Sequence, residues 1–178
     1  VLYNSQETLK NVEKHAKFVR EKGLKVGVVV QASNEEDWLE LYDKFVVNPE
    51  VDLIGISILS VPKSFGGSIV SSRIKLLKKL IERGNNTKDL HMLGMGEGGE
   101  DLQFAKQHCP FVVSHDSSSA FWNAMQGKKI VSAQINNLRV EGGKTSIPVD
   151  FNFKNATQEQ LERAQDNINL IKEKLCHN

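Results

Sequence analysis

The chain has few of the features that would tie it to a membrane, an oxidising compartment or a polyanion. Its 178 residues include two cysteines, Cys109 and Cys176, which lack metal-ligand spacing and fit a reducing cytoplasm. No apolar run approaches the roughly 18–20 residues of a membrane span, and no signal-peptide pattern is present. The 23 basic and 22 acidic residues nearly cancel, so no global field draws the chain to a charged partner. We therefore expect a cytoplasmic protein without a membrane partner.

Apolar segments of strand type alternate with amphipathic segments of helix type along most of the chain. The pattern predicts strands at 25–31, 53–59, 90–94 and 111–114. It predicts helices at 5–22, 35–48, 69–83, 100–108 and 118–126, with a loop rich in Gly and Ser at 60–68. Successive strand–helix units predict an α/β fold with a parallel sheet and right-handed crossovers. An open doubly wound sheet and part of a (β/α)₈ barrel both fit.

The regular alternation ends at Gly127. Strand-like pieces follow at 129–135, 137–140 and 146–149, and the capping box Thr157-x-x-Gln160 begins a last helix that reaches about residue 175. We expect all 178 residues to form a single α/β domain with this C-terminal addition. Four units are half of a barrel of about 250 residues, and the chain opens without an initiator Met. The expectation is the C-terminal half of a (β/α)₈ TIM-type barrel, with its N-terminal strands absent.

Polar residues or glycines follow each predicted strand, where ligands and chemistry gather in α/β proteins. In chain order these are Gln31, then Ser57 and Ser60, then Gly94 and Gly96, then Ser114 and Asp116. Gln31 offers an amide donor and acceptor, and the glycines allow close backbone approach. An aspartate held by a strand can serve as nucleophile, base or ligand. The structural alternatives are a satisfied strand end, a tight turn, and capping of the next helix by Asp116 and the serines after it.

Two other patterns have weaker functional interpretations. Gly94-x-Gly96-x-x-Gly99 matches a dinucleotide-binding fingerprint, but Glu97, Glu100 and Asp101 oppose a pyrophosphate there. The basic helix at 69–83 is either a solvated face or a face for a phosphate backbone; its cations are Arg73, Lys75, Lys78, Lys79 and Arg83. His91 and His115 have no partner at metal-ligand spacing, so structural roles are the default and no metal site is expected. Trp122 is expected to pack in the core or to wall the site.

Four segments together resemble the tRNA-guanine transglycosylase superfamily: residues 25–31 ending in Val-Val-Gln, Ile54-Gly-Ile-Ser57, His91-Met-Leu-Gly-Met-Gly96 and Val113-Ser-His-Asp116. The form Ser-x-Asp-Ser-Ser-Ser, with Trp122 downstream, is most similar to the divergent, often phage-encoded branch. Members of that branch insert 7-deazaguanines into DNA. The resemblance covers about residues 20 to 130.

The resemblance implies base exchange in nucleic acid through an aspartyl covalent intermediate. Asp116 would be the catalytic nucleophile that attacks C1′ and expels guanine. Gln31 would bind the purine edge, and Ser57, Gly94, Gly96 and Ser114 would line the base pocket. The partners would be DNA or tRNA and a 7-deazapurine base, with no cofactor. A base in duplex DNA would have to be extruded.

Several departures from the family narrow this expectation. The second catalytic aspartate of the family, on an early barrel strand, has no counterpart, so the chain alone is expected to be inactive. The structural zinc site of the tRNA enzymes is missing, and Ala32 stands where the family has Gly; DNA is thus expected rather than tRNA. The oligomeric state is left open, with a homodimer as one option. The alternatives are a non-catalytic nucleotide-binding α/β domain and a TIM-barrel enzyme of small-molecule metabolism, although the strand ends lack a lysine for Schiff-base chemistry.

Overall fold

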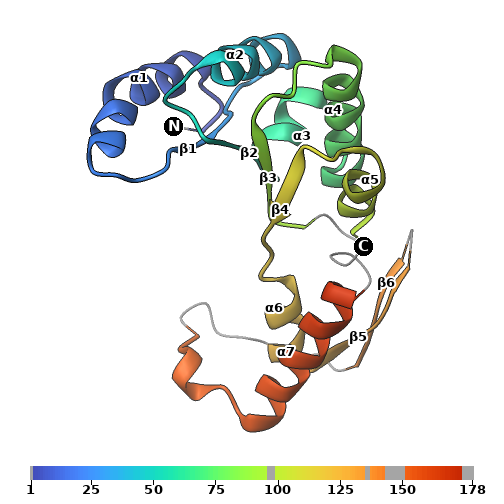
Figure 1. The fold of residues 1–178 in the computed structure, drawn as a ribbon. Helices are drawn as coiled ribbons and strands as arrows, with labels where there is room; N and C mark the ends of the chain where they lie inside the picture. Colours follow the sequence, from blue (N-terminus) through green and yellow to red (C-terminus); the bar gives the residue numbers. More distant parts are fainter. Residues whose placement is uncertain (1, 96–98, 135–136, 143–150, 174–178) are drawn as a thin grey trace.

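The computed structural model describes residues 2–95, 99–134, 137–142 and 151–173 (Figure 1). Its four-stranded parallel sheet has the order β1-β2-β3-β4. The strands are β1 (Gly27–Val29), β2 (Leu53–Ser57), β3 (Asp89–Leu93) and β4 (Val112–His115). The helices around it are α1 (Ser5–Glu21), α2 (Glu35–Val47), α3 (Ser60–Phe65), α4 (Ile69–Arg83) and α5 (Glu100–His108). The predicted α/β fold with successive parallel units is confirmed.

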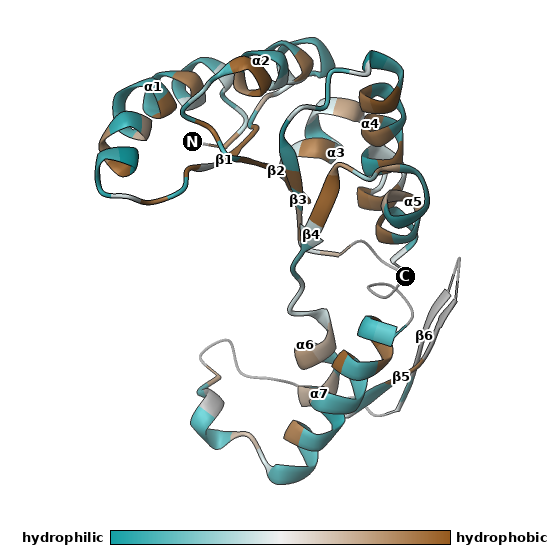
Figure 2. Ribbon diagram, viewed as in Figure 1, coloured by the Kyte–Doolittle hydropathy of each residue, from teal (hydrophilic) through white to brown (hydrophobic). Residues whose placement is uncertain are grey.

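The helices lie along one side of the sheet, and the other side stays partly open (Figure 1). Apolar side chains fill the covered side; Val28, Ile54, Ile56, Leu90 and Met92 are all buried. The strands and the inner sides of the helices are accordingly apolar, and the outer sides of the helices are polar (Figure 2). On the opposite face of the sheet, side chains of β1 and β3 remain partly exposed. Burial of one face supplies the main driving force for this arrangement.

Helix α4 illustrates how the sequence sets the local structure. Ser68 caps its first turn through a capping box. Gly84, with a φ of 66°, ends the helix in the left-handed conformation that glycine adopts without strain. Leu76, Leu77 and Leu80 recur at helical spacing and are fully buried. The predicted bounds of this helix are confirmed.

The loop predicted at residues 60–68 is wrong for its first six residues, which form α3. Val61 and Phe65 of this short helix are buried, and the Phe65 ring packs edge-on against Trp38 with 5.7 Å between the ring centroids. Pro62 lies in the first turn, where its missing N–H removes no helical hydrogen bond. Tertiary packing therefore decides the conformation of a segment whose composition is typical of a loop.

The chain after β4 forms a second group of elements, beyond the end of that strand (Figure 1). It comprises α6 (Ser119–Met125), an antiparallel pair of β5 (Lys128–Gln134) and β6 (Asn137–Gly142), the 3-10 turn η2 (Phe153–Asn155) and α7 (Gln158–Ile171). The first two predicted strand pieces and the Thr157 capping box are confirmed. The piece predicted at 146–149 and the end of the last helix at 174–175 lie outside the described residues.

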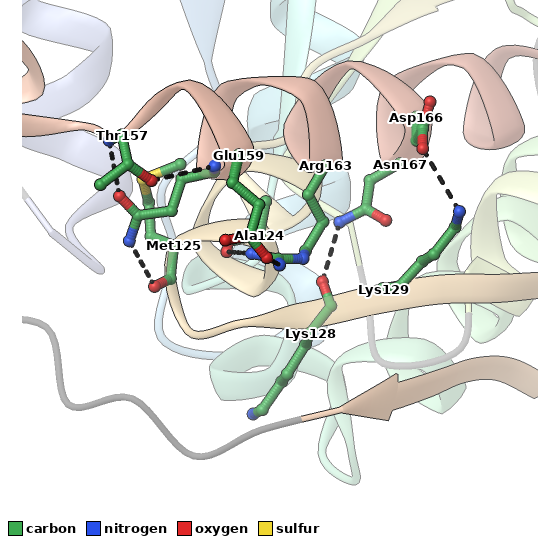
Figure 3. Close-up of polar contacts among 10 residues, drawn as sticks. Ala124, Met125, Lys128, Lys129, Thr157, Glu159, Arg163, Asp166 and Asn167 are labelled. Atoms are coloured by element: carbon green, nitrogen blue, oxygen red, sulfur yellow. Dashed lines mark hydrogen bonds and ion pairs between the residues drawn. The ribbon is translucent and has the colours of Figure 1, made fainter.

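Side chains of α7 tie this second group together (Figure 3). Gln160 Nε2 donates to the carbonyl of Met125 at 3.0 Å, and Arg163 Nη1 donates to the carbonyl of Ala124 at 3.2 Å. These carbonyls belong to the last turn of α6, where the regular helical donors run out; the Ala124 carbonyl also accepts the backbone N–H of Gly127 at 3.0 Å. Asn167, fully buried, lies between α6 and β5. Helix α7 thus adds side-chain donors to the C-terminal end of α6.

Candidate functional site

Asp116 lies one residue beyond the end of β4. Its backbone N–H donates to the Met92 carbonyl at 3.2 Å, which extends the pairing of β3 with β4. Its Oδ1 accepts the N–H of Gly94 at 2.5 Å. The side chain remains 60% exposed. The aspartate is therefore held by the two strands and still presents its carboxylate to solvent.

A β-bulge determines the face on which this carboxylate lies. Leu90 pairs with Val112, whereas His91 pairs with Ser114, so Val113 is the extra residue in β4. Because side chains alternate along a strand, one extra residue moves those after it to the other face. Ser114 therefore lies beside His91 on the open face, and Asp116 follows two residues later.

His91 connects Ser114 with Asp116 across the two strands. Its Nδ1 lies 2.8 Å from Ser114 Oγ, and its Nε2 lies 3.9 Å from Asp116 Oδ2. Only 21% of the His91 side chain is exposed. A proton on Nε2 would point to the carboxylate while Nδ1 accepts the serine hydroxyl. The strand ends thus combine a hydroxyl, an imidazole and a carboxylate, groups that can transfer protons or attack an electrophile.

Gly94, immediately after β3, is fixed on both sides of its Cα. Its N–H is used by Asp116, and its carbonyl accepts Arg73 Nη1 at 2.9 Å. Its φ is 71°, and an added Cβ would lie 2.9 Å from two side-chain carbons of Ile58. Only glycine fits this position without strain. The sequence predicts that the Gly94 backbone lines a base pocket. Its N–H is already bonded to Asp116, so this N–H has no free hydrogen to donate to a base. Gly96 lies outside the described residues.

Arg73, at the centre of this arrangement, was missed as a site residue by sequence reasoning. It is fully buried, and its Nη1 lies 3.0 Å from Asp101 Oδ2, which is also fully buried. Burial lowers the pKa of the Arg73 guanidinium, while the carboxylates of Asp101 and Asp116 raise it. A signal was present in the sequence: Arg73 precedes Leu76, Leu77 and Leu80 at helical spacing. It therefore occupies the apolar face of α4.

The other predicted binding residues serve local structure. Gln31 Oε1 accepts the N–H of Tyr3 at 3.4 Å. Ser57 is buried, and its Oγ accepts the N–H groups of Leu59 and Ser60 at 3.1 and 3.2 Å, just before and at the start of α3. Of the predicted residues, the structure brings Ser114 and Gly94 to Asp116. Gln31 follows β1, which two strands separate from β4.

Capping of α6, the structural alternative for Asp116, does not use its carboxylate in the described contacts. The helix begins after Ser118, which makes no side-chain capping hydrogen bond. The N–H of Ser119 is satisfied by Ser117 Oγ at 3.1 Å. The carboxylate reaches back to Gly94 in the neighbouring strand end instead. This contact favours a site at the strand ends over a helix cap.

The basic face of α4 is largely neutralised by α2. Lys75 and Lys79 both pair with Glu35, at 2.6 and 2.7 Å. Arg83 pairs with Asp43 at 2.8 Å. Lys78 Nζ lies over the Phe104 ring of α5, 5.8 Å from the ring centroid, in a cation–π arrangement. The pairing of these cations favours a structural role over contact with a phosphate backbone.

The dinucleotide alternative also lacks support among the described elements. Ligands of doubly wound sheets bind where the strand order reverses, and the order β1-β2-β3-β4 contains no reversal. Glu100 and Asp101 lie in the first turn of α5, where a pyrophosphate would need positive potential.

Trp122, the other residue expected near the site, is 37% exposed and packs edge-on against Phe121.

Within the described ranges, no group of three or more His, Cys, Asp or Glu side chains is arranged to hold a metal ion. In the same part of the chain, no helix combines the length and apolar character needed to cross a bilayer.

The transglycosylase resemblance rests on four short sequence motifs alone. The interpretation of this site therefore depends on the geometry around Asp116, His91 and Arg73. Comparison with protein-family models, with curated proteins and with solved structures finds no match to this chain.

Proposed function

We propose that the protein is a transglycosylase-like enzyme that replaces guanine in nucleic acid by a 7-deazaguanine, with Asp116 as the nucleophile. One observation carries the proposal: a carboxylate at the end of a strand, fixed by Gly94 through Oδ1, leaves Oδ2 beside His91 and exposed. A positioned, solvent-accessible carboxylate is what nucleophilic attack on a sugar carbon requires. DNA is the proposed acceptor in preference to tRNA.

The proposed reaction has two displacements at the same sugar carbon. In the first, an Asp116 oxygen bonds to C1′ while the C1′–N9 bond breaks, and guanine leaves with that electron pair and takes up a proton. In the second, N9 of the 7-deazaguanine loses its proton and bonds to C1′, and the carboxylate is released. No atom changes oxidation state overall, so no cofactor is needed. The family resemblance assigns the proton transfers to a second aspartate on an early barrel strand.

We also propose that the sheet is half of a (β/α)₈ barrel. Three features support this: the strands follow chain order, the helices lie on one side, and the polar residues gather after the strands. In a barrel, inward side chains form the interior, and the loops after the strands build the active site. His91 and Ser114 would then face the barrel interior, and Asp116 would lie at its catalytic rim.

Covalent trapping on a denaturing gel tests the function. The full-length protein is incubated with guanine-containing DNA or with tRNA, and 9-deazaguanine is added to stall exchange. We expect a covalent adduct with the wild type that is absent in Asp116→Asn. The matched control is Asp166→Asn on α7, because the Asp166 side chain is also 60% exposed; it should form the adduct normally.

The trapping experiment has clear contrary outcomes. Absence of an adduct on both nucleic acids, with Asp116→Asn altering only thermal stability, would exclude the transglycosylase function. An adduct on tRNA alone would keep the chemistry and overturn the preference for DNA. An adduct that persists in Asp116→Asn would assign the nucleophile to another residue.

A further inference from the structure

Arg73, the buried cation of α4, interacts with the other charged groups around the site. Arg73 contacts Asp101 of α5 and the Gly94 carbonyl after β3. Its charge also acts on Asp116 and, from β4, on His115. The pairing with Asp101 compensates the cost of burying a guanidinium. Arg73 itself has no exposed surface, so it cannot touch a substrate.

The two peptide groups that flank the Gly94 Cα are held from opposite sides. Asp116 Oδ1 accepts the N–H at 2.5 Å, and Arg73 Nη1 donates to the carbonyl at 2.9 Å. Both bonds involve an ionised group, and such hydrogen bonds are stronger than neutral ones. The N–H and the carbonyl of Gly94 belong to two peptide planes that meet at its Cα, where φ is 71°. A shift of the carbonyl plane therefore changes the direction of the N–H. An anchor on the carbonyl therefore aims the N–H at the carboxylate.

We propose that Arg73 is a positioning residue for Asp116, which it fixes through Gly94. Arg73 holds the Gly94 carbonyl, Gly94 holds Oδ1, and Oδ2 is left for the reacting carbon. This inference rests on the proposed function for its catalytic consequence, while the anchoring of Gly94 can be measured without any substrate. In enzyme sites generally, buried side chains hold reactive groups in place through supporting hydrogen bonds, and Arg73 would act in this way.

Other features of the region agree with this role. Asp101 is placed as the counterion of Arg73, and burial of both leaves neither side chain to solvent. Arg73 Nε and Nη2 have no hydrogen-bond partner among the described residues. The guanidinium is therefore positioned by packing and by two polar contacts, one to Asp101 and one to Gly94. A lysine would keep the charge but lose the fixed planar geometry.

The test removes the buried pair as a unit. Arg73→Met alone would leave the Asp101 carboxylate buried and unpaired, and such variants often unfold. The double variant Arg73→Met/Asp101→Leu replaces both charges by apolar groups of similar size. The matched control is Arg83→Met/Asp43→Leu, because Arg83 of α4 and Asp43 of α2 also form an Arg–Asp pair, 2.8 Å apart, in which both side chains are partly exposed. Thermal melting identifies folded variants before further measurement.

Two readouts are compared for each folded variant. Amide hydrogen exchange at Gly94, followed by NMR, measures the anchoring; we expect it to be at least about tenfold faster in the Arg73/Asp101 variant and unchanged in the control. Single-turnover adduct formation measures the consequence; its rate should fall by a similar factor, with unchanged affinity for the nucleic acid. Arg73→Lys should recover part of both effects.

The outcomes separate the two proposals. Unchanged exchange at Gly94 in the Arg73/Asp101 variant overturns the anchoring, whatever the enzyme does. Faster exchange with an unchanged adduct rate overturns the positioning role. If the wild type forms no adduct, the proposed function fails and the catalytic role of Arg73 fails with it, while the exchange data still decide whether Arg73 anchors Gly94.

Discussion

Substitution of Asn167 should destabilise the protein more than any other single change of a polar residue in α7. Its side chain is fully buried and makes three hydrogen bonds. Nδ2 donates to the carbonyls of Ala120 at 3.0 Å and Lys128 at 3.2 Å, and Oδ1 accepts the N–H of Ile130 at 2.7 Å. One amide thus joins α7 to both α6 and β5.

The expected cost follows from those three bonds. Each contributes about 0.5–1.5 kcal/mol net, and a buried group left without a partner costs about 1–3 kcal/mol. Asn167→Ala removes all three and leaves the Ile130 N–H unsatisfied in a buried position. We expect a loss of about 3 kcal/mol in the free energy of unfolding. For a chain of this length, that corresponds to a fall in Tm of about 6–12 °C.

Urea unfolding followed by circular dichroism measures this loss. The matched control is Asn169→Ala, two residues later on the exposed side of the same helix, where the amide accepts from Gln165; it should cost less than about 0.5 kcal/mol. Asn167→Leu fills the space but supplies no partners, so it should remain destabilising. A loss below about 1 kcal/mol for both Asn167 variants would refute the view that this amide holds α7 in place.

Two further predictions concern ionisable groups. Burial lowers the pKa of His115, with a smaller contribution from His91 and opposition from Asp116; the unfolded chain therefore binds the proton more readily, and stability should fall as the pH drops below about 6.5. Urea unfolding at pH 7.5 and 5 should show a smaller difference for His115→Gln than for wild type, and an equal difference would contradict this. Burial raises the pKa of the Cys109 thiol to about 11, so at pH 8 its thiolate fraction is about two hundredfold below that of a free cysteine. In a Cys176→Ser variant, thiol labelling should be correspondingly slow until denaturant is added, whereas rapid labelling of the folded protein would show that Cys109 is accessible.

Much of the fold could be predicted from the sequence because its elements carry strong local signals. The bounds of α4 and α5 are confirmed residue for residue. In α4, apolar spacing, an N-terminal serine and a terminal glycine all agree. Helix α3 lacks such agreement, because serines and glycines surround it and only the packing of Val61 and Phe65 makes it helical. Local propensity yields to tertiary burial at such positions.

The candidate site was predicted less completely than the fold. The sequence identified Asp116, Ser114 and Gly94 as strand-end residues, and the structure brings them together. It could not show that Gln31 and Ser57 have local hydrogen-bond partners, because the same residue types serve both purposes. The spacing that placed Arg73 among the leucines of α4 was readable, but a charged residue is normally assigned to the solvent side.

The position of the catalytic candidate finally depends on a single backbone irregularity. With regular pairing throughout, His91 would lie opposite Val113, and Ser114 would lie opposite Met92, on the side that the helices cover. Asp116, two residues further, would turn to that buried side as well. The bulge at Val113 shifts the register by one residue, so the polar residues Ser114 and Asp116 reach the open face. His115 takes the covered side instead, and this explains why burial, rather than a neighbouring charge, dominates its pKa. The residue types at the end of β4 therefore show which side chains face the site only when the bulge is known. No periodicity in the sequence indicates that bulge.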